Sequence, residues 1–593
     1  MPGILLITPP LTQLNTSYPA TTQLCGFLRK EGLECYQSDL SIELVNKVLT
    51  KQSVEKIFSL IQNDKLPKKY KIMLQNDDFY TNTIDSVVRF LSGKDDSLAA
   101  RFSDTAFWPV TKKLPADEDL EWAFGTSGIH DKAKHLCTFF IKDIAELIRD
   151  TIDPNFELIR YAEKLCLHLP EFEPLEKELQ KDYSFIDTLM LELFSAKVAE
   201  LKPDYVGFSV PFPGNLYAAL RCAQWLRKFH PEIKIVMGGG YVSTELRQIT
   251  DGKIFDYIDY LVFDDGELPL MRILKNEKLV RTIYRNDSGQ LVREDFDSKE
   301  NIRFAETGTP DYDGLVQNNY IHLIELTNPM HTLWSNGRWN KMMLAHGCYW
   351  GKCAFCDGSL DYIARYEISP ATLLVDRMEQ IMKQTGVSGF HFVDEAASPA
   401  VLRKLAEEIL KRKLVVSYWT NIRFEKSFNT ELCYLLAKSG CIAVSGGVEV
   451  ASPRILKMIN KGITIESAGE CLKNLTEAGI MTHAYLMYGF PTETAQETIE
   501  SLDVVRSFFA NGWLHSAFWH RYAMTVHSPT GIRPAEFGAR HLQDKPNAFA
   551  NNEIPFSTKN EIDLDFYGKG LNLATYNYMN GTGFDVDVKK WFK

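Results

Sequence analysis

The sequence predicts an α/β protein in which a doubly wound parallel sheet with a helical insertion is followed by a partial (β/α)6 barrel and a C-terminal extension. Three patterns support this fold class. Short apolar runs alternate with helix-like stretches near the N-terminus, and the same alternation resumes after residue 200. A second series of βα units begins near residue 340. Continuous apolar runs of this kind are typical of strands buried on both faces of a parallel sheet.

The first sheet is predicted from strand-like runs that flank helices such as Tyr18–Glu31. These runs are Gly3–Ile7, Leu33–Asp39, Asp204–Val210, Ile233–Met237 and Tyr260–Phe263. A doubly wound sheet binds its ligand at the carboxyl ends of its strands. In this sequence those ends carry Thr8, Pro9, Ser209, Val210, Gly238, Gly239, Gly240 and Asp264. We assign residues 1–40 and 200–275 to this domain.

The remaining segments complete the predicted domain plan. Residues 41–199 show the spacing of amphipathic helices, so we expect a helical insertion. Residues 276–337 are expected to form a hairpin, which turns at Asn286–Gly289, and a polar connector. Residues 338–528 contain the repeated βα units of the barrel, and residues 529–593 form an extension whose fold the sequence does not predict.

The barrel is predicted from strand-like runs that alternate with amphipathic helices. The predicted strands are Met342–Ala345, Gly389–Val393, Val415–Thr420, Ile442–Val450, Thr482–Tyr488 and a sixth at Trp519–Tyr522. The predicted helices are Ala371–Thr385, Pro399–Lys411, Thr430–Ser439 and Ile465–Ala478. A barrel of this type carries its site at the carboxyl ends of its strands.

Bulk properties restrict the class of protein. A chain of 593 residues is long enough for about three or four domains. No window approaches the ~20 apolar residues of a membrane span, and the N-terminus lacks the basic flank of a signal peptide, so we expect a cytoplasmic protein. A formal net charge of -11 argues against a nucleic-acid surface.

The cysteines fall into two groups. Most are scattered through apolar patterns, where a free cysteine behaves as a small buried hydrophobe, and their odd total of 11 argues against a disulfide framework. Cys348, Cys353 and Cys356 instead lie within nine residues. Three thiolates leave one iron of a four-iron cluster open to a small molecule. A structural zinc site needs four ligands, so a zinc knuckle would require a fourth such as His346 or Asp357.

The loop resembles that of radical S-adenosylmethionine (SAM) enzymes, in which an aromatic residue, here Phe355, precedes the last cysteine. With the preceding sheet, the chain resembles the cobalamin-binding members of this family, the class B methyltransferases. This implies a Rossmann-like cobalamin-binding domain and a TIM-type radical SAM barrel. The family usually has three residues between its first two cysteines, whereas Cys348 and Cys353 are separated by four. We expect Gly351 to accommodate the extra residue.

The resemblance implies a 4Fe-4S cluster held by Cys348, Cys353 and Cys356, and SAM bound to its open iron. The segments at the ends of the barrel strands then supply the expected SAM contacts. These are Phe355, Glu395, Arg423, Ser445, Glu449 and Gly489. A guanidinium such as that of Arg423 binds a carboxylate through two hydrogen bonds. Acidic residues and glycines at strand ends also occur as helix caps and turns, and Arg423 could equally form a structural ion pair.

For the sheet domain the resemblance implies that the residues at the strand ends contact cobalamin. The loop Pro9–Asn15 has no histidine to bind cobalt from below, and the radical SAM branch of cobalamin proteins usually lacks this ligand. Missing side chains at Gly238–Gly240 would let a planar ring or a nucleotide tail approach the backbone. A structural domain of the same fold that binds no cofactor is the alternative.

The implied function is methylation of an unactivated carbon through a 5′-deoxyadenosyl radical and methylcobalamin. The alternatives are a rearrangement or cyclisation by the same cofactors, and a cobalamin or iron–sulfur sensor without turnover. The implied partner is an electron donor such as flavodoxin or ferredoxin. The sequence leaves the substrate open among small molecules, lipids and peptides.

Overall fold

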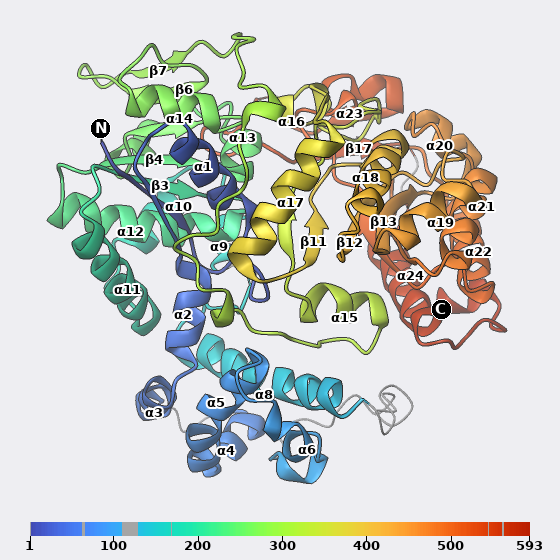
Figure 1. Ribbon diagram of the computed structural model, residues 1–593, viewed down its shortest axis with the longest axis horizontal. Helices are drawn as coiled ribbons and strands as arrows, with labels where there is room; N and C mark the ends of the chain where they lie inside the picture. The colour runs from blue at the N-terminus through green and yellow to red at the C-terminus, as the bar shows by residue number, and fades with distance from the viewer. Residues whose placement is uncertain are drawn as a thin grey trace.

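The computed structural model describes residues 2–61, 66–109, 128–159, 161–167, 169–543, 545–559 and 562–593. Two large sheets dominate it, one in each half of the chain (Figure 1). The mixed α/β class that the sequence predicts is confirmed, with the parallel sheets flanked by helices.

Among the described residues the first sheet has seven strands in the order β2-β1-β3-β4-β5-β6-β7. The strands are β1 (Ile4–Thr8), β2 (Cys35–Asp39), β3 (Tyr205–Ser209), β4 (Lys234–Gly238), β5 (Tyr260–Val262), β6 (Thr282–Arg285) and β7 (Leu291–Glu294). The first five pair in parallel, as predicted. The predicted hairpin is also present, and its strands β6 and β7 extend this sheet antiparallel to β5.

Both faces of the first sheet are buried, which explains why β1 is apolar throughout. Ile4 and Leu6 pack on one face, with α1 (Pro19–Lys30) and α14 (Glu267–Leu274). Leu5 and Ile7 pack on the other face, with α12 (Leu216–Phe229). The alternation follows from the period of two that a strand imposes on its side chains.

The segment between β2 and β3 is helical, and part of it forms a separate lobe at the bottom of Figure 1. Its longer helices are α2 (Leu40–Val48), α3 (Lys51–Leu60), α4 (Lys68–Gln75), α5 (Asp77–Leu91), α8 (Ile129–Thr151), α10 (Glu173–Leu179) and α11 (Phe185–Leu201). The buried guanidinium of Arg221 on α12 lies 3.2 Å from Asp187 on α11 and ties the insertion to the sheet domain.

The second sheet has, among the described residues, six parallel strands in the order β8-β11-β12-β13-β14-β15. The strands are β8 (Asn340–Met342), β11 (Gly389–Phe392), β12 (Ser417–Ile422), β13 (Cys441–Glu449), β14 (Met481–Tyr488) and β15 (Ser516–Arg521). The main flanking helices are α17 (Ala371–Thr385), α18 (Pro399–Lys411), α19 (Thr430–Lys438), α21 (Ile465–Glu477) and α22 (Ala495–Ala510). No pairing of β15 with β8 is seen in the described chain, so this is the open, partial barrel that the sequence predicts.

The first predicted barrel strand is divided in the structure. β8 ends at Met342, and Ala345 begins the short strand β9 (Ala345–His346), which pairs with β10 (Glu367–Ile368). The buried carboxylate of Asp394 accepts the backbone N–H groups of Leu344 at 3.0 Å and Ala345 at 2.9 Å. Because these groups bond to a side chain, the strand leaves the sheet just before the cysteine loop.

The C-terminal extension covers the outer side of the barrel. Its long helix α24 (Leu564–Met579) packs on β15, where Trp519 donates from Nε1 to the hydroxyl of Thr575 at 2.8 Å. The first part of the extension forms α23 (Pro529–Ile532) and the hairpin of β16 (Ala539–His541) and β17 (Phe556–Thr558).

The carboxyl edge of the first sheet faces the barrel. The loop after β1 reaches the start of the barrel, where Thr16 donates to the carbonyl of Trp339 at 2.6 Å and Lys341 donates to Gln13 at 2.9 Å. On the opposite side the ring of His527 lies 2.8 Å from the carbonyl of Thr244. Among the described helices, none combines the length and the apolar character that crossing a membrane requires.

Gly239 tests how tightly the backbone packs at the carboxyl edge of the first sheet. Its φ is 109°, and a Cβ atom there would lie 2.7 Å from the backbone of Val210. We expect Gly239→Ala to destabilise the protein by about 3 kcal/mol, from backbone strain and overpacking together. Gly289→Ala is the control, because Gly289 has a φ of 80° but nothing within 4 Å of a Cβ, so about 1 kcal/mol is expected. Equal shifts in the thermal midpoint of the two variants would contradict this account.

Candidate cofactor site at the cysteine loop

The cysteine loop lies between β9 and α16 (Asp361–Ala364), at the carboxyl end of the barrel. Its entry is fixed at Gly347, which has a φ of 74° and whose Cβ position would lie 1.9 Å from the carbonyl oxygen of Arg365. Further along, Ala354 donates to the carbonyl of Ile459 at 2.8 Å. These backbone contacts hold both halves of the loop against the barrel.

The three thiols form a donor set that fits a metal cluster. None is in a disulfide; Cys353 is buried and Cys348 and Cys356 are half-buried. A hydrogen bond from Cys356, with the nearby charges of Lys461 and Arg423, lowers the pKa of the Cys353 thiol to about 6. The same contact raises the pKa of Cys356. Thiolates are the form that ligates metals, so a cationic environment suits ligation.

The extra residue of the loop is accommodated by Gly351 and Trp350. Gly351 has a φ of 58°. The indole of Trp350 donates from Nε1 to the carbonyl of Asn460 at 2.9 Å. Its ring packs on the backbone of Gly462, where a Cβ atom would lie only 2.2 Å from the ring. In return Asn460 donates from Nδ2 to the carbonyl of Lys352 at 3.1 Å. The longer spacing is thus anchored to the segment after α20 (Pro453–Met458).

Arg423, predicted as a SAM contact, lies beneath this loop. Its guanidinium carbon is 4.4 Å from the centre of the Trp350 ring, and its Nη2 donates to the carbonyl of Lys461. Its Nε is 3.5 Å from Glu425. The structure therefore brings Arg423 to the cysteine loop, but with its guanidinium already in contact with protein groups.

Glu449 and Phe355 meet at Lys461, a contact that the sequence does not predict. The carboxylate of Glu449 is 2.6 Å from Lys461 Nζ, and this ammonium is 5.7 Å from the centre of the Phe355 ring. Burial favours the neutral amine, but the carboxylate outweighs burial and raises the pKa of Lys461. Ser445 is buried four residues earlier on β13. Glu449 is thus close to the thiols, and Phe355 precedes Cys356 directly.

Glu395 and Gly489 lie at the ends of two other strands. Glu395 follows β11, and part of its side chain is exposed. The protein groups around its carboxyl keep water away from it and raise its pKa. Its neighbour Asp394 is instead fully engaged with the backbone before the loop. Gly489 closes the turn after β14 with a φ of 81°, and its N–H donates to the buried carboxyl of Glu493 at 2.8 Å.

The two groups considered as a fourth zinc ligand point elsewhere. Both ring nitrogens of His346 have other neighbours, with Nδ1 2.8 Å from the carbonyl of Arg365 and Nε2 3.0 Å from Asp265. The carboxylate of Asp357 accepts from Thr525 and, at 3.2 Å, from Tyr362. The donor set of the loop is therefore three thiols, which favours the cluster over a closed zinc site.

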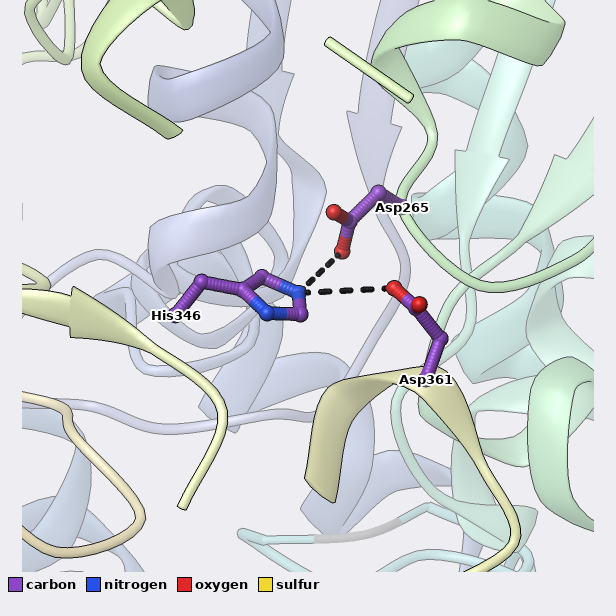
Figure 2. A group of neighbouring side chains, drawn as sticks. All are labelled: Asp265, His346 and Asp361. Atoms are coloured by element: carbon purple, nitrogen blue, oxygen red, sulfur yellow. Dashed lines mark hydrogen bonds and ion pairs between the residues drawn. The ribbon is translucent and has the colours of Figure 1, made fainter. Parts of the chain in front are cut away.

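His346 belongs to an ionic group that joins the loop to the first sheet. Figure 2 shows its imidazole directed between the carboxylates of Asp265, which follows β5, and Asp361 on α16. Two carboxylates and an imidazole could hold a divalent cation. Here the guanidinium of Arg365 contacts Asp265 and lies 3.0 Å from both Asp361 and His346 Nε2. Arg365 therefore occupies the place of the cation.

At the carboxyl edge of the first sheet, a cavity of about 290 Å³ opens between α1 and the start of the barrel. Of the residues predicted to contact cobalamin, it is lined by Ser209, Gly238, Gly239, Gly240 and Asp264. Thr8, Pro9 and Val210 are not part of its lining. They are buried, and the carbonyl of Pro9 accepts from Thr12 at 2.9 Å and Asn215 at 3.2 Å.

The cavity also has a wall that sequence reasoning missed. Tyr18 enters from the start of α1, and Lys341 and Val393 enter from the barrel. Burial, with the nearby carboxylate of Glu395, raises the pKa of Tyr18 to about 12, and burial lowers the pKa of Lys341 to about 7. The lining is mainly apolar, and besides Tyr18 its ionisable groups are Asp264, Asp265, Glu267 and Lys341.

The anchor at Trp350 can be tested on cluster retention. We expect Trp350→Ala to speed the loss of iron from the reconstituted protein to a chelator by about tenfold, because a cation–π contact and a hydrogen bond are both lost. Trp350→Phe keeps the ring over Arg423 and should lose iron at an intermediate rate. Identical rates in the wild type and both variants would show that the indole does not anchor the loop.

Comparisons with known proteins agree with this geometry. Residues 342–505 match the model of the Radical SAM superfamily. An anaerobic magnesium-protoporphyrin IX monomethyl ester cyclase of Rubrivivax gelatinosus is 30% identical over 346 residues, which are 55% of this chain and 59% of the cyclase. The uncharacterized methyltransferase PH0819 of Pyrococcus horikoshii is 25% identical over 332 residues, 54% of this chain and 68% of that protein.

The solved structure of the cobalamin-dependent S-adenosylmethionine radical enzyme OxsB shares the fold, with a TM-score of 0.50 and 15% identity. The likeness covers 65% of this chain and 59% of that one. Over the cyclase, too, the match spans little more than half of the relative's length. The match over residues 342–505 coincides with the open βα barrel that carries the three-thiol loop at its carboxyl end.

Proposed function

We propose that this protein is a cobalamin-dependent radical SAM enzyme that transfers a methyl group to an unactivated carbon. The observation that carries the proposal is the meeting of two sites, because the cavity of the first sheet opens onto the barrel that bears the three thiols. Lys341 and Val393 line that cavity from barrel strands or their ends. A reaction that needs both cofactors requires them to face one another.

The residues present would bind the cofactors and exclude water from the space between them. Cys348, Cys353 and Cys356 would hold a 4Fe-4S cluster, which supplies the electron that cleaves SAM, and the cavity at Gly238–Gly240 would hold cobalamin as the methyl carrier. Glu449, Glu395 and the backbone near Gly489 are the protein groups available to SAM at the strand ends. The buried surroundings of Tyr18 and Lys341 would keep water from the space between the cofactors.

A second reaction type is supported by the relatives. The cyclase of Rubrivivax gelatinosus matches over more than half of this chain, as does the methyltransferase PH0819. Ring formation without methyl transfer is therefore the alternative activity for the same site. Either activity needs an electron donor such as flavodoxin or ferredoxin to reduce the cluster.

The cluster assignment is tested by three substitutions with a matched control. We expect Cys348→Ala, Cys353→Ala and Cys356→Ala each to abolish cleavage of SAM to 5′-deoxyadenosine, because each removes one ligand of the cluster. Cys433→Ala should retain cleavage, since Cys433 is a buried cysteine on α19. Formation of 5′-deoxyadenosine by any of the three loop variants would remove that cysteine from the cluster.

Methyl transfer is tested separately with methyl-labelled SAM and hydroxocobalamin under reducing, anaerobic conditions. We expect label on the cobalamin bound to the protein, together with S-adenosylhomocysteine. Cleavage of SAM to 5′-deoxyadenosine with no label on cobalamin would favour the cyclisation activity instead. Failure of both reactions with a fully loaded protein would favour a sensor.

A further inference from the structure

A polar groove lies where the first sheet domain meets the barrel, and we call it the seam groove. It has a volume of about 860 Å³ and runs between α1 and α17 (Figure 1). Residues 305–311 form its third side. Sites for small molecules commonly have about 300–1,000 Å³. None of the three loop cysteines is among the described residues that line it, so the groove is separate from the cysteine loop.

The side chains that line the seam groove are mostly cationic. Arg29, Lys30, Arg377 and Lys383 line it together with a single carboxylate, that of Asp311. Arg29 lies 2.8 Å from Asp311 and compensates it. Lys383 is exposed, and no ion pair holds it within the described chain. The lining therefore has an excess of positive charge, although the formal net charge of the chain is -11.

Arg377 is the unusual member of this set, because its guanidinium is buried without a carboxylate. The residue is 3% exposed, and its Nη2 donates to the backbone carbonyl of Ala305 at 3.0 Å. Its Nε is buried and has no hydrogen-bond partner in the part of the chain that the structure describes. Burial alone lowers the pKa of Arg377, with no nearby carboxylate to oppose the effect. A buried charge is costly unless it is paired, so this side chain indicates a missing anion.

The other buried arginines show how the protein pairs a guanidinium elsewhere. Arg221 lies 3.2 Å from Asp187. Arg423 lies 3.5 Å from a carboxylate of its own loop, and Arg281 lies 3.9 Å from one that follows β5. Among the buried arginines of the described residues, Arg377 alone has no carboxylate within 4 Å, and it lines a groove. The missing partner is therefore expected from outside the chain.

The donors of α17 lie along one side of the seam groove. Arg377, Gln380 and Gln384 are three and four residues apart, a spacing that places them on one side of a helix. The hydroxyl of Thr309 donates to Oε1 of Gln380 at 2.7 Å, so the amide nitrogen of Gln380 stays available as a donor. A guanidinium, an amide and the ammonium of Lys383 thus follow one another along the groove. Such a row of donors matches the acceptor oxygens of a phosphate.

We propose that the seam groove binds a small molecule that carries a phosphate group, with Arg377 as its principal contact. A phosphate monoester has three acceptor oxygens and a charge of about -1.5 to -2 at pH 7, which suits a lining of donors and cations. The guanidinium would bind two of its oxygens, and Lys383 would act as a point charge. The ligand would contact α1 and α17 together and so join the sheet domain to the barrel. This site does not depend on the reaction proposed above.

The test titrates ribose 5-phosphate, ribose and inorganic phosphate into the full chain reconstituted with iron, sulfide and hydroxocobalamin. SAM is present throughout to occupy the open iron. We expect calorimetry to show at least about tenfold tighter binding of ribose 5-phosphate than of ribose, because charge-assisted hydrogen bonds are the strong ones. Ribose 5-phosphate should also raise the thermal midpoint of unfolding, since it binds only the folded chain. Inorganic phosphate that binds as tightly as ribose 5-phosphate would assign the groove to the free ion, and weaker binding to a phosphorylated molecule.

Two variants locate the binding. Arg377→Gln should weaken the binding of ribose 5-phosphate by at least about tenfold, because it removes a charged donor from a buried place. Lys383→Gln should weaken it by about threefold, and because Lys383 is exposed this substitution leaves the fold intact. The control is Lys404→Gln, at an exposed lysine on α18 outside the groove, which should bind as the wild type does.

Equal affinities for ribose 5-phosphate and ribose would overturn the inference. So would unchanged binding in both groove variants, or a loss in Lys404→Gln as large as that in Lys383→Gln, which would show only a general attraction of anions. SAM cleavage is measured on the same preparation. Cleavage without binding in the groove would reject this site and leave the proposed function intact, whereas binding without cleavage would do the reverse.

Discussion

The relative placement of the two candidate cofactor sites depends on the contact between Arg365 and Asp265. Asp265 follows β5 of the first sheet, and Arg365 follows the cysteine loop and α16, so this ion pair joins the two edges that must face each other. Burial acts to raise the pKa of Asp265, but the hydrogen bond from His346 and the charge of Arg365 outweigh it and lower the pKa. The pair is thus kept charged near neutral pH.

The same guanidinium also fixes the local chemistry of the loop. Arg365 compensates the carboxylate of Asp361 as well as that of Asp265, which would otherwise repel each other beside His346. Removing one partner of a fully buried ion pair commonly costs about 3–5 kcal/mol, because the charge that is left has no compensation. The cost here is smaller, since the side chains of Arg365 and Asp265 are 17% and 29% exposed. A metal ion at this place would replace Arg365, and the cysteine loop would lose the side chain that ties it to the first sheet.

Much of the fold followed from the sequence because its causes are local. Apolar runs such as β1 and the alternation of strands and helices gave both parallel sheets, and the dense group of Cys348, Cys353 and Cys356 gave the loop. The break after Met342 was not predictable, since it arises when Asp394, some fifty residues later, takes the N–H groups of Leu344 and Ala345. The hairpin was predicted, but its place in the sheet depends on pairing with β5.

The partners of the site residues were less predictable, because they come from segments that are far apart in the sequence. The residue type and strand-end position of Arg423 suggest a carboxylate ligand, but its surroundings are Trp350 and the carbonyl of Lys461. The sequence does not predict that Lys461 pairs with Glu449 and lies beside Phe355, because the fold brings these residues together.

The longer cysteine spacing illustrates how one local change depends on a distant segment. An additional residue between Cys348 and Cys353 needs a left-handed glycine, which Gly351 supplies, but a flexible loop alone would not hold a thiolate in place. The rigid element is Trp350, whose ring needs the bare backbone of Gly462 and the carbonyl of Asn460. Since Lys461 lies between those two residues and reaches Glu449, the segment that anchors the longer loop also places a positive charge beside its thiols.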